Sequence, residues 1–263
     1  MMGARNPILM KSTMACALFS AISLSILLGA SGKKVPDYLQ LCKKNTPQYD
    51  QCTQNAIEAA KPYLAKGIPK MKVPPLEPLT IPQLIIDRNL EAIKVKAKLD
   101  NVTVFGCSNF DIQKLKINTD KLTLDISLLL PKLFVECEYD VDGRLLVIPL
   151  RGKGHFIGNM TNVKVDISGQ GELTNVKGKE YVLIKKLKMK PRVGDTTVKF
   201  INDNKKNPEN RLITETAANF INQNRRQVLD IVTPIAEETA LEVGLQIIST
   251  IFSTVPFDEL LPQ

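Results

Sequence analysis

Long stretches of alternating apolar and polar residues constrain the fold of this chain more than any other feature. Between about residues 84 and 201 the period is two, as at Ile93 and Val95, which a lysine separates. Because successive side chains of a strand point to opposite faces, such segments have one apolar and one solvated face, which is typical of antiparallel sheets. Asp142 and Gly143, between two apolar runs, predict a hairpin turn. The alternation recurs over residues 93–99, 122–128, 133–141, 163–167 and 187–189.

Two segments outside the alternating region have helical periodicity. Apolar residues spaced like one helical face predict a helix over residues 50–66, ended by Gly67. Residues 208–252 predict a second, much longer helix, with a kink at Pro234. A helix of ~40 residues spans ~60 Å, so we expect an elongated sheet to wrap around it.

The first 32 residues are expected to be a secretory signal peptide. Arg5 and Lys11 precede an uncharged run over residues 14–28, and small residues follow it. That run is too short for a comfortable membrane span, although a retained anchor helix is the alternative. We therefore expect a secreted, extracellular protein with one domain over residues 33–263. The rest of the chain has no further run of 18 apolar residues, so no stable membrane insertion is expected.

Four cysteines remain after the predicted signal segment, which suits disulfide formation in an exported protein. Cys42 and Cys52 enclose a short loop and are each other's best partners. Cys107 and Cys137 lie in successive strand-like segments, where they either pair or remain as two free buried thiols. The wide spacings and the single histidine argue against a zinc site, and no metal or other cofactor is expected.

Two sequons fit an exported glycoprotein. Asn101 and Asn159 each stand two residues before a threonine and are the predicted glycosylation sites.

The chain is basic, with a formal net charge of +8. Its lysines are spread in alternation along the strand-like segments, which indicates a solvated face, and an exported protein seldom meets nucleic acid. No nucleic acid partner is therefore expected. For one group of lysines, contact with anionic lipid is an alternative interpretation to a solvated face. These lysines are Lys185, Lys186, Lys188 and Lys190.

No arrangement of residues supports catalysis. His155 would need a nearby nucleophile and an orienting acid, and the chain has no Gly-x-Ser-x-Gly elbow. Glu136 and Glu138 lie on one solvated strand face, and nothing else supports a glycosidase pair. What remains is abundant apolar surface without reactive groups. Such surface either encloses a ligand cavity or packs into a solid core, and the pattern alone leaves both open.

Several short segments together suggest a family. They are the Cys42 and Cys52 pair, KGIP at 66–69, VPPLEPL at 73–79, VFGCSNF at 104–110, YDVDGRLLVIPLRGKG at 139–154, FINDN at 200–204, and IF at 251–252 with VPFDEL at 255–260. Jointly they resemble the takeout / juvenile hormone-binding protein family of secreted arthropod haemolymph carriers. The resemblance covers nearly the whole of residues 33–263. Cys107 and Cys137 depart from the family's pattern.

The resemblance implies an α+β fold in which a long, curved antiparallel sheet wraps a long C-terminal helix, as in the tubular lipid-binding proteins. It also implies a hydrophobic tunnel, no enzymatic activity and a monomer. The expected cargo is a juvenile hormone-like terpenoid, a fatty acid or another lipid. The residues expected to line the tunnel lie on apolar faces: Val135, Tyr139, Leu145, Val147, Phe156, Phe220, Ile231, Ile235, Ile248 and Phe252.

Two other functions remain open at this point. One is a secreted signalling or interaction protein with the same fold, a closed core and no ligand. The other is a secreted hydrolase, which the missing nucleophile and base disfavour.

The hydroxyl of Tyr139 would bind a polar group of the cargo or, alternatively, a local partner in the core.

Overall fold

Two long neighbouring strands form the centre of the sheet. The computed structural model describes residues 35–44, 46–202 and 208–262, so the predicted signal segment lies outside the described residues. Strand β4 (Thr123–Leu145) pairs along its whole length with β5 (Ile148–Val176). The alternation changes phase within β4, because its apolar positions are mainly even-numbered from Leu124 to Leu130 and odd-numbered from Leu133 to Leu145.

The remaining strands extend this central pair on both sides. β1 (Leu79–Asn89) pairs with β2 (Ile93–Phe105), and β2 pairs with β4 beside β3 (Asp111–Asn118). On the other side, β6 (Lys179–Arg192) and β7 (Asp195–Asn202) pair with successive parts of β5. All these pairings are antiparallel, which confirms the predicted sheet.

The flanking strands are interrupted at the same level on both sides of the central pair. Residues 106–110 separate β2 from β3, and residues 193–194 separate β6 from β7. Pro131 of β4, which has no N–H to donate, lies at this level. The carboxylate of Glu77 accepts hydrogen bonds from the Gly106 N–H at 2.9 Å and the Ser108 hydroxyl at 3.2 Å. The proline-rich stretch before β1 is thereby fastened to the interruption.

Asp142 and Gly143 do not form the hairpin turn that the sequence predicts. Gly143 lies inside β4, and the two-residue turn to β5 is Leu146 and Val147. The physical reason is a close approach between strands: a Cβ on Gly143 would stand 2.1 Å from the carbonyl oxygen of Lys94 on β2. The glycine is needed for this contact and for its φ of +155°, not for a turn.

The first helix agrees with its prediction. α1 spans Tyr49–Lys66 and ends at Gly67, whose N–H donates to the Leu64 carbonyl. In its first turn, Asp50 accepts a hydrogen bond from the Ile117 N–H of β3 at 3.0 Å. A short 3₁₀ helix, η1 (Pro69–Met71), follows within the proline-rich stretch, and α4 (Phe257–Leu260) lies near the C-terminus.

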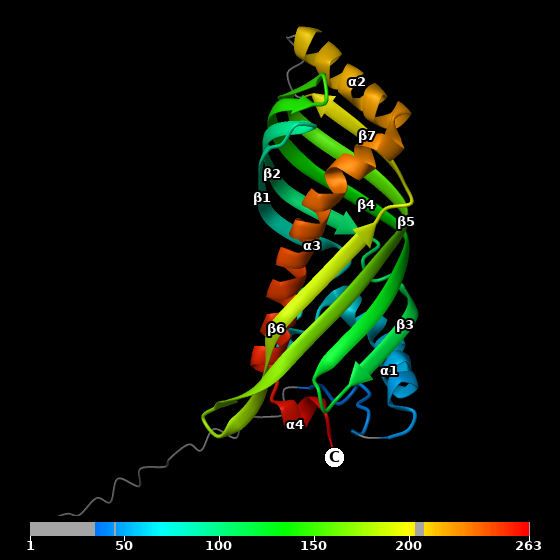
Figure 1. Ribbon diagram of the computed structural model, residues 1–263, viewed down its shortest axis with the longest axis vertical. Helices are drawn as coiled ribbons and strands as arrows, with labels where there is room; N and C mark the ends of the chain where they lie inside the picture. The colour runs from blue at the N-terminus through cyan, green and yellow to red at the C-terminus, as the bar shows by residue number, and fades with distance from the viewer. Residues whose placement is uncertain (1–34, 45, 203–207, 263) are drawn as a thin grey trace, which may run out of the picture. The chain divides into compact units, whose positions relative to one another are not determined.

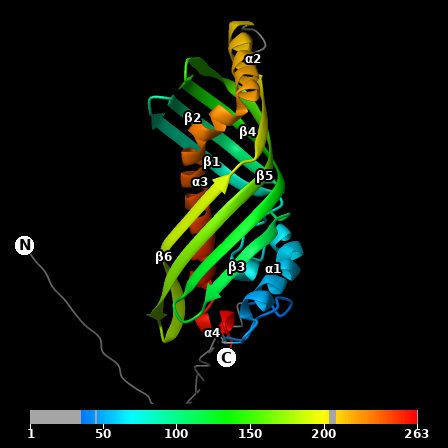
Figure 2. The ribbon, with the colours of Figure 1, turned by 45° about the vertical axis from the view of Figure 1, so that its right-hand side comes forward.

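The C-terminal segment forms two helices instead of one long kinked helix. α2 (Pro208–Gln223) and α3 (Arg225–Thr254) are separated at Asn224, and α3 continues through Pro234. The break is stabilised locally, because the side-chain amide of Asn224 donates a hydrogen bond to the Phe220 carbonyl oxygen at 2.9 Å. Figures 1 and 2 show the sheet curving around α3, which confirms the predicted architecture of curved sheet and long C-terminal helix.

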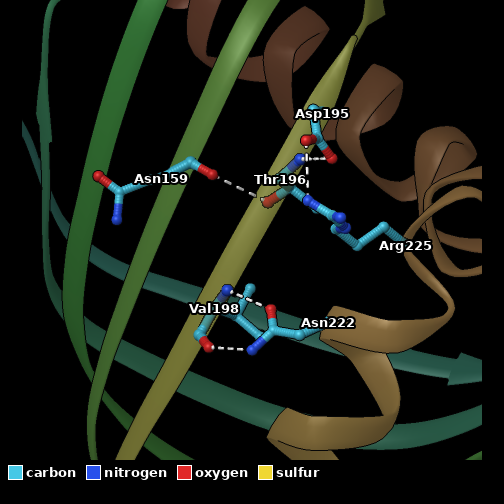
Figure 3. Close-up of polar contacts among 6 residues, drawn as sticks. All are labelled: Asn159, Asp195, Thr196, Val198, Asn222 and Arg225. Atoms are coloured by element: carbon cyan, nitrogen blue, oxygen red, sulfur yellow. Dashed lines mark hydrogen bonds and ion pairs between the residues drawn. The ribbon is translucent and has the colours of Figure 1, made fainter.

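Asn222 ties α2 to the edge of the sheet. Its amide oxygen accepts from the Val198 N–H and its amide nitrogen donates to the Val198 carbonyl, both at 2.8 Å (Figure 3). The side chain therefore replaces a neighbouring strand for β7, whose outer edge would otherwise be unpaired. Arg225, at the start of α3, makes an ion pair of 2.8 Å with Asp195 at the start of the same strand.

We expect Asn222→Ala to lower the free energy of unfolding by about 1–3 kcal/mol, because two part-buried hydrogen bonds are lost and the Val198 groups stay without partners. Asn222→Asp should not rescue stability, since a carboxylate would face the Val198 carbonyl oxygen. Urea denaturation of the three proteins measures both effects. Equal stability of all three would show that β7 needs no such partner.

Buried apolar side chains form three separate clusters. The first joins β2 and β4 to α2 and α3, and it includes Val95, Leu145 and Ile221. The second lies at the opposite end of α3, around Val35 and Val255. The third lies between α1 and the β3 side of the sheet. The apolar interior is therefore divided between separate packed regions.

Candidate ligand-binding site

An apolar pocket of about 250 Å³ lies where the N-terminal segment, α1, η1, the end of α3 and α4 meet. Its wall contains mostly aliphatic side chains, which favour an apolar ligand. The main apolar lining residues are Leu39, Leu41, Ala56, Ile57, Ala60, Leu64, Met71, Ile251 and Leu260.

Covalent and packing contacts hold the N-terminal wall of this pocket. The predicted disulfide between Cys42 and Cys52 is present, with the Cα atoms 5.9 Å apart, and it joins residues 35–42 to α1. The rings of Tyr38 and Tyr63 stack with their centroids 4.2 Å apart. These contacts keep a segment with no regular secondary structure in place as one side of the pocket.

Helix α1 supplies the opposite wall through its own periodicity. Ala56, Ala60 and Leu64 are four residues apart and therefore lie on one face of the helix. The two alanines leave room that larger side chains would fill. No residue of α1 is fully buried, and its apolar face both borders the pocket and packs against the core clusters through Ile57 and Leu64.

Two hydroxyl groups interrupt the apolar wall. Tyr49 and Thr53 lie one turn apart on α1 and both line the pocket. Burial raises the pKa of the Tyr49 phenol, an effect that a hydrogen bond with Thr53 opposes and the nearby Asp50 charge reinforces. The phenol is therefore neutral at physiological pH and can exchange hydrogen bonds with an uncharged polar group.

The apolar surface continues from the pocket along α3. Only Val228 and Ile235 of this helix are buried, and no residue from 236 to 254 is buried, although this part includes Ile248, Ile251 and Phe252. The second half of α3 therefore keeps apolar side chains that the rest of the chain covers only in part.

The structure divides the ten predicted lining residues among several places. Leu145 and Ile235 are buried in the first core cluster, with Phe220 and Ile231 packed against it. Tyr139 is buried, and its ring and that of Phe156 both contact Phe200, with centroids 5.4 and 5.3 Å apart. None of these residues lines the apolar pocket.

Three predicted residues are half-buried and one is misplaced. Val135, Ile248 and Phe252 are half-buried on β4 and α3. Val147 is wrong as a lining residue, since it lies in the turn between β4 and β5 with 85% of its surface exposed. β4 ends at Leu145, and Val147 belongs to the exposed turn that follows it.

The prediction missed the pocket residues of α1 and of residues 35–42. A signal was available, because the apolar face of residues 50–66 needs a covering partner and the disulfide brings a segment with Leu39 and Leu41 to it. Comparison with known protein families gives a match over most of the chain. Residues 15–262 match the family model described as haemolymph juvenile hormone binding protein.

The chain belongs to this family. Members of the family are binding proteins for hydrophobic ligands, and its description places them in haemolymph. The circadian clock-controlled protein daywake of Drosophila melanogaster is 26% identical over 235 residues, which are 85% of this chain and 87% of daywake. A Schistocerca gregaria protein provisionally described as a beta-carotene-binding protein is 21% identical over 227 residues, 85% of this chain and 88% of that protein.

A solved structure of the same fold is Takeout 1 from Epiphyas postvittana. It superposes with a TM-score of 0.67 and 22% identity, over 81% of this chain and 96% of that one. The likeness confirms the takeout-like fold predicted from the sequence. Among the described helices of this family member, none is both long and apolar enough to cross a membrane.

The second cysteine pair of this family member is not bonded. Cys107 and Cys137 are free, so the alternative of two thiols holds in the structure and the possible second bridge does not. Burial, together with the charge of Glu77, raises the pKa of Cys107 to about 12, and burial raises that of Cys137 to about 11. Because the thiolate is the reactive form, both thiols are poorly reactive at neutral pH.

The two predicted glycosylation sites differ in their surroundings. Asn101 is exposed at an irregularity of β2, where the register with β4 shifts between Asp100 and Thr103. Asn159 is half-buried within β5, between β4 and β7. An oligosaccharide is therefore more easily accommodated at Asn101.

Two other groups of polar residues lie outside the apolar pocket. His155 lies 4.0 Å from Glu136, and both side chains are partly exposed on the solvated face of the sheet. No cluster of three or more potential metal ligands exists among the described residues. A second pocket, of about 450 Å³, lies at the junction of α2 and α3 and has a polar wall that includes Asp195, Arg225 and Arg226.

Proposed function

We propose that this protein is a secreted carrier that holds one small hydrophobic molecule in its apolar interior. The cargo class is a juvenile hormone-like terpenoid, a fatty acid or another lipid. The observation that carries the proposal is the apolar pocket, whose wall includes Ile251 of α3. The carrier acts as a monomer, catalyses no reaction and binds no nucleic acid.

The size of the pocket indicates how such a cargo lies. About 250 Å³ is less than the usual volume of a site for a drug-sized ligand. Ile251 belongs to the pocket wall, and Ile248 and Phe252 flank it on α3. We therefore propose that one end of the cargo fills the pocket and that an apolar chain extends along α3 towards Val135.

The energy available from burial is sufficient for useful affinity. Removing ~400 Å² of apolar surface from water yields ~10 kcal/mol at ~25 cal/mol/Å². The free-energy cost of ordering the ligand and the chain cancels several kcal/mol of this gain. Micromolar or tighter binding is therefore expected. Tyr49 and Thr53 would contribute selectivity by binding one uncharged polar group at the pocket end of the cargo.

Two adjacent alanines of α1 provide the test. Ala60→Phe fills the pocket and is expected to weaken binding of a fluorescent fatty acid at least ~tenfold, whereas Ala59→Phe places the same ring on the exposed side of the helix and should leave the affinity within ~twofold. Fluorescence titration gives both dissociation constants. Equal affinities of both variants and of the unchanged protein would exclude the pocket as the binding site.

A further inference from the structure

The hairpin between β5 and β6 ends in an exposed tip. Figures 1 and 2 show it projecting beyond α4 and the neighbouring strands. Its two turn residues, Lys177 and Gly178, both have positive φ, and the Gly178 N–H donates to the Asn175 side chain at 3.0 Å. No atom lies within 4 Å of the position that a Cβ on Gly178 would occupy. The side chains of the tip are therefore presented to the surroundings in a fixed arrangement.

A bulge in β6 places apolar and basic side chains on one face of this hairpin. Gln170 pairs with Lys186, but its neighbour Gly171 pairs with Ile184, so Lys185 is an extra residue. An extra residue reverses the alternation beyond it. Leu183 therefore lies on the same face as the exposed lysines of β6, which are Lys186, Lys188 and Lys190.

Lysines outnumber carboxylates along the β5–β6 hairpin, and Asp166, the β5 partner of Lys190, forms its ion pair with Arg192 instead. Residues 172–190 contain six lysines and two glutamates, which give a local charge of +4. Lys185 pairs with Glu172 at 2.8 Å, and none of the other five lysines takes part in an ion pair among the described residues. Elsewhere on the sheet, lysines do find carboxylates, as Lys153 does with Asp140 at 2.7 Å.

Exposed apolar side chains accompany these lysines. Leu183 is 47% exposed, and Val176, which lies on the same face beside the turn, is 49% exposed. Apolar side chains that enter the headgroup region, combined with lysines that attract anionic lipids, are the features of peripheral membrane binding. An acidic protein would match the lysines alone and would leave the apolar residues at the tip unexplained.

We propose that the solvent-facing side of the β5–β6 hairpin docks this protein on an anionic phospholipid membrane. Leu183 and Val176 enter the interface, and Lys186, Lys188 and Lys190 contact the lipid headgroups. The docking is peripheral and reversible, without insertion of a membrane-spanning segment. It goes beyond the proposed carrier function, and its test requires no cargo.

The experiment is sedimentation of the full chain with vesicles. Phosphatidylcholine vesicles with about one-third phosphatidylserine should bind the protein, pure phosphatidylcholine vesicles should bind it much less, and added salt should weaken the binding. K186E/K188E/K190E should reduce the affinity at least ~tenfold, because each lysine near an anionic surface contributes about fivefold. V176S/L183S should also reduce it ~tenfold, since the apolar contact is lost.

The matched control is K66E/K70E/K72E, which changes three exposed lysines outside the sheet that form no ion pair among the described residues and alters the net charge equally. This variant should bind within ~threefold of the unchanged protein, since its charges lie outside the docking face. Circular dichroism verifies that all variants are folded. The proposal is overturned if the unchanged protein binds no anionic vesicles, if the control loses as much affinity as the β6 variant, or if V176S/L183S binds undiminished.

Discussion

Replacing both bridging cysteines, in C42S/C52S, is expected to lower the free energy of unfolding by roughly 2–3 kcal/mol and to weaken ligand binding at least ~tenfold. The stability loss follows from the extra freedom of the unfolded chain once a loop with a sequence separation of 10 is opened. The loss of binding follows from the wall of the pocket, because residues 35–42 carry Leu39 and Leu41 and have no regular secondary structure of their own. Urea denaturation and a fluorescent fatty acid titration measure the two effects.

Reductant provides the control for this variant. Dithiothreitol should weaken binding by the unchanged protein to the level of C42S/C52S and should leave C42S/C52S itself unaffected. Cys107 and Cys137 are free already, so their reduction contributes nothing. Undiminished ligand binding by C42S/C52S would mean that the segment is held in place without its covalent link or is not part of the site.

Gly143→Ala is expected to destabilise the protein by at least ~3 kcal/mol, at or above the upper end of the usual range for single substitutions, or to prevent folding. A methyl group at this position would stand 2.1 Å from the Lys94 carbonyl oxygen and 2.7 Å from the Val95 Cα, both of which belong to the backbone of β2 and cannot rotate away. The φ of +155° adds strain for any residue with a Cβ. The midpoint of urea denaturation, followed by circular dichroism, measures the loss.

Gly178→Ala is the matched comparison for this substitution. Gly178 also has a positive φ, of +82°, but a methyl group there would meet no atom within 4 Å. Its cost should therefore be limited to backbone strain, about 1–2 kcal/mol. If both substitutions have the same small effect, Gly143 is not packed against the backbone of β2, and the pairing of β2 with β4 at this position is wrong.

The elements that could be predicted were those with a strong period. The alternation at Ile93 and Val95 is maintained because each strand has one solvated face, and the apolar spacing over residues 50–66 reflects a helix with one covered side. Such local patterns depend on which face meets water and require no knowledge of distant neighbours. The antiparallel sheet, α1 and the C-terminal helices followed from them.

The details that failed depend on contacts between segments distant in the sequence. The sequence around Gly143 is typical of a turn, and only the close approach of β2 explains the glycine. The helix break at Asn224 lies beside Asn222, which forms hydrogen bonds with β7. The pocket is a further example, because its wall combines residues 35–42, α1 and Ile251. Apolar residues that line a cavity and apolar residues that pack in a core have the same sequence pattern, so the predicted lining residues included both kinds. Val147 is of neither kind, because it is exposed.

The most direct test of the account is to measure what the folded protein holds in its apolar interior. Protein purified from a eukaryotic expression host is extracted with organic solvent for mass spectrometry, and the stripped protein is titrated with a fluorescent fatty acid. We predict saturable binding of one molecule per chain, competition by long apolar molecules, and reduced capacity in Ala60→Phe. An empty extract together with a titration that never saturates would contradict the account, because the interior would then be closed to cargo.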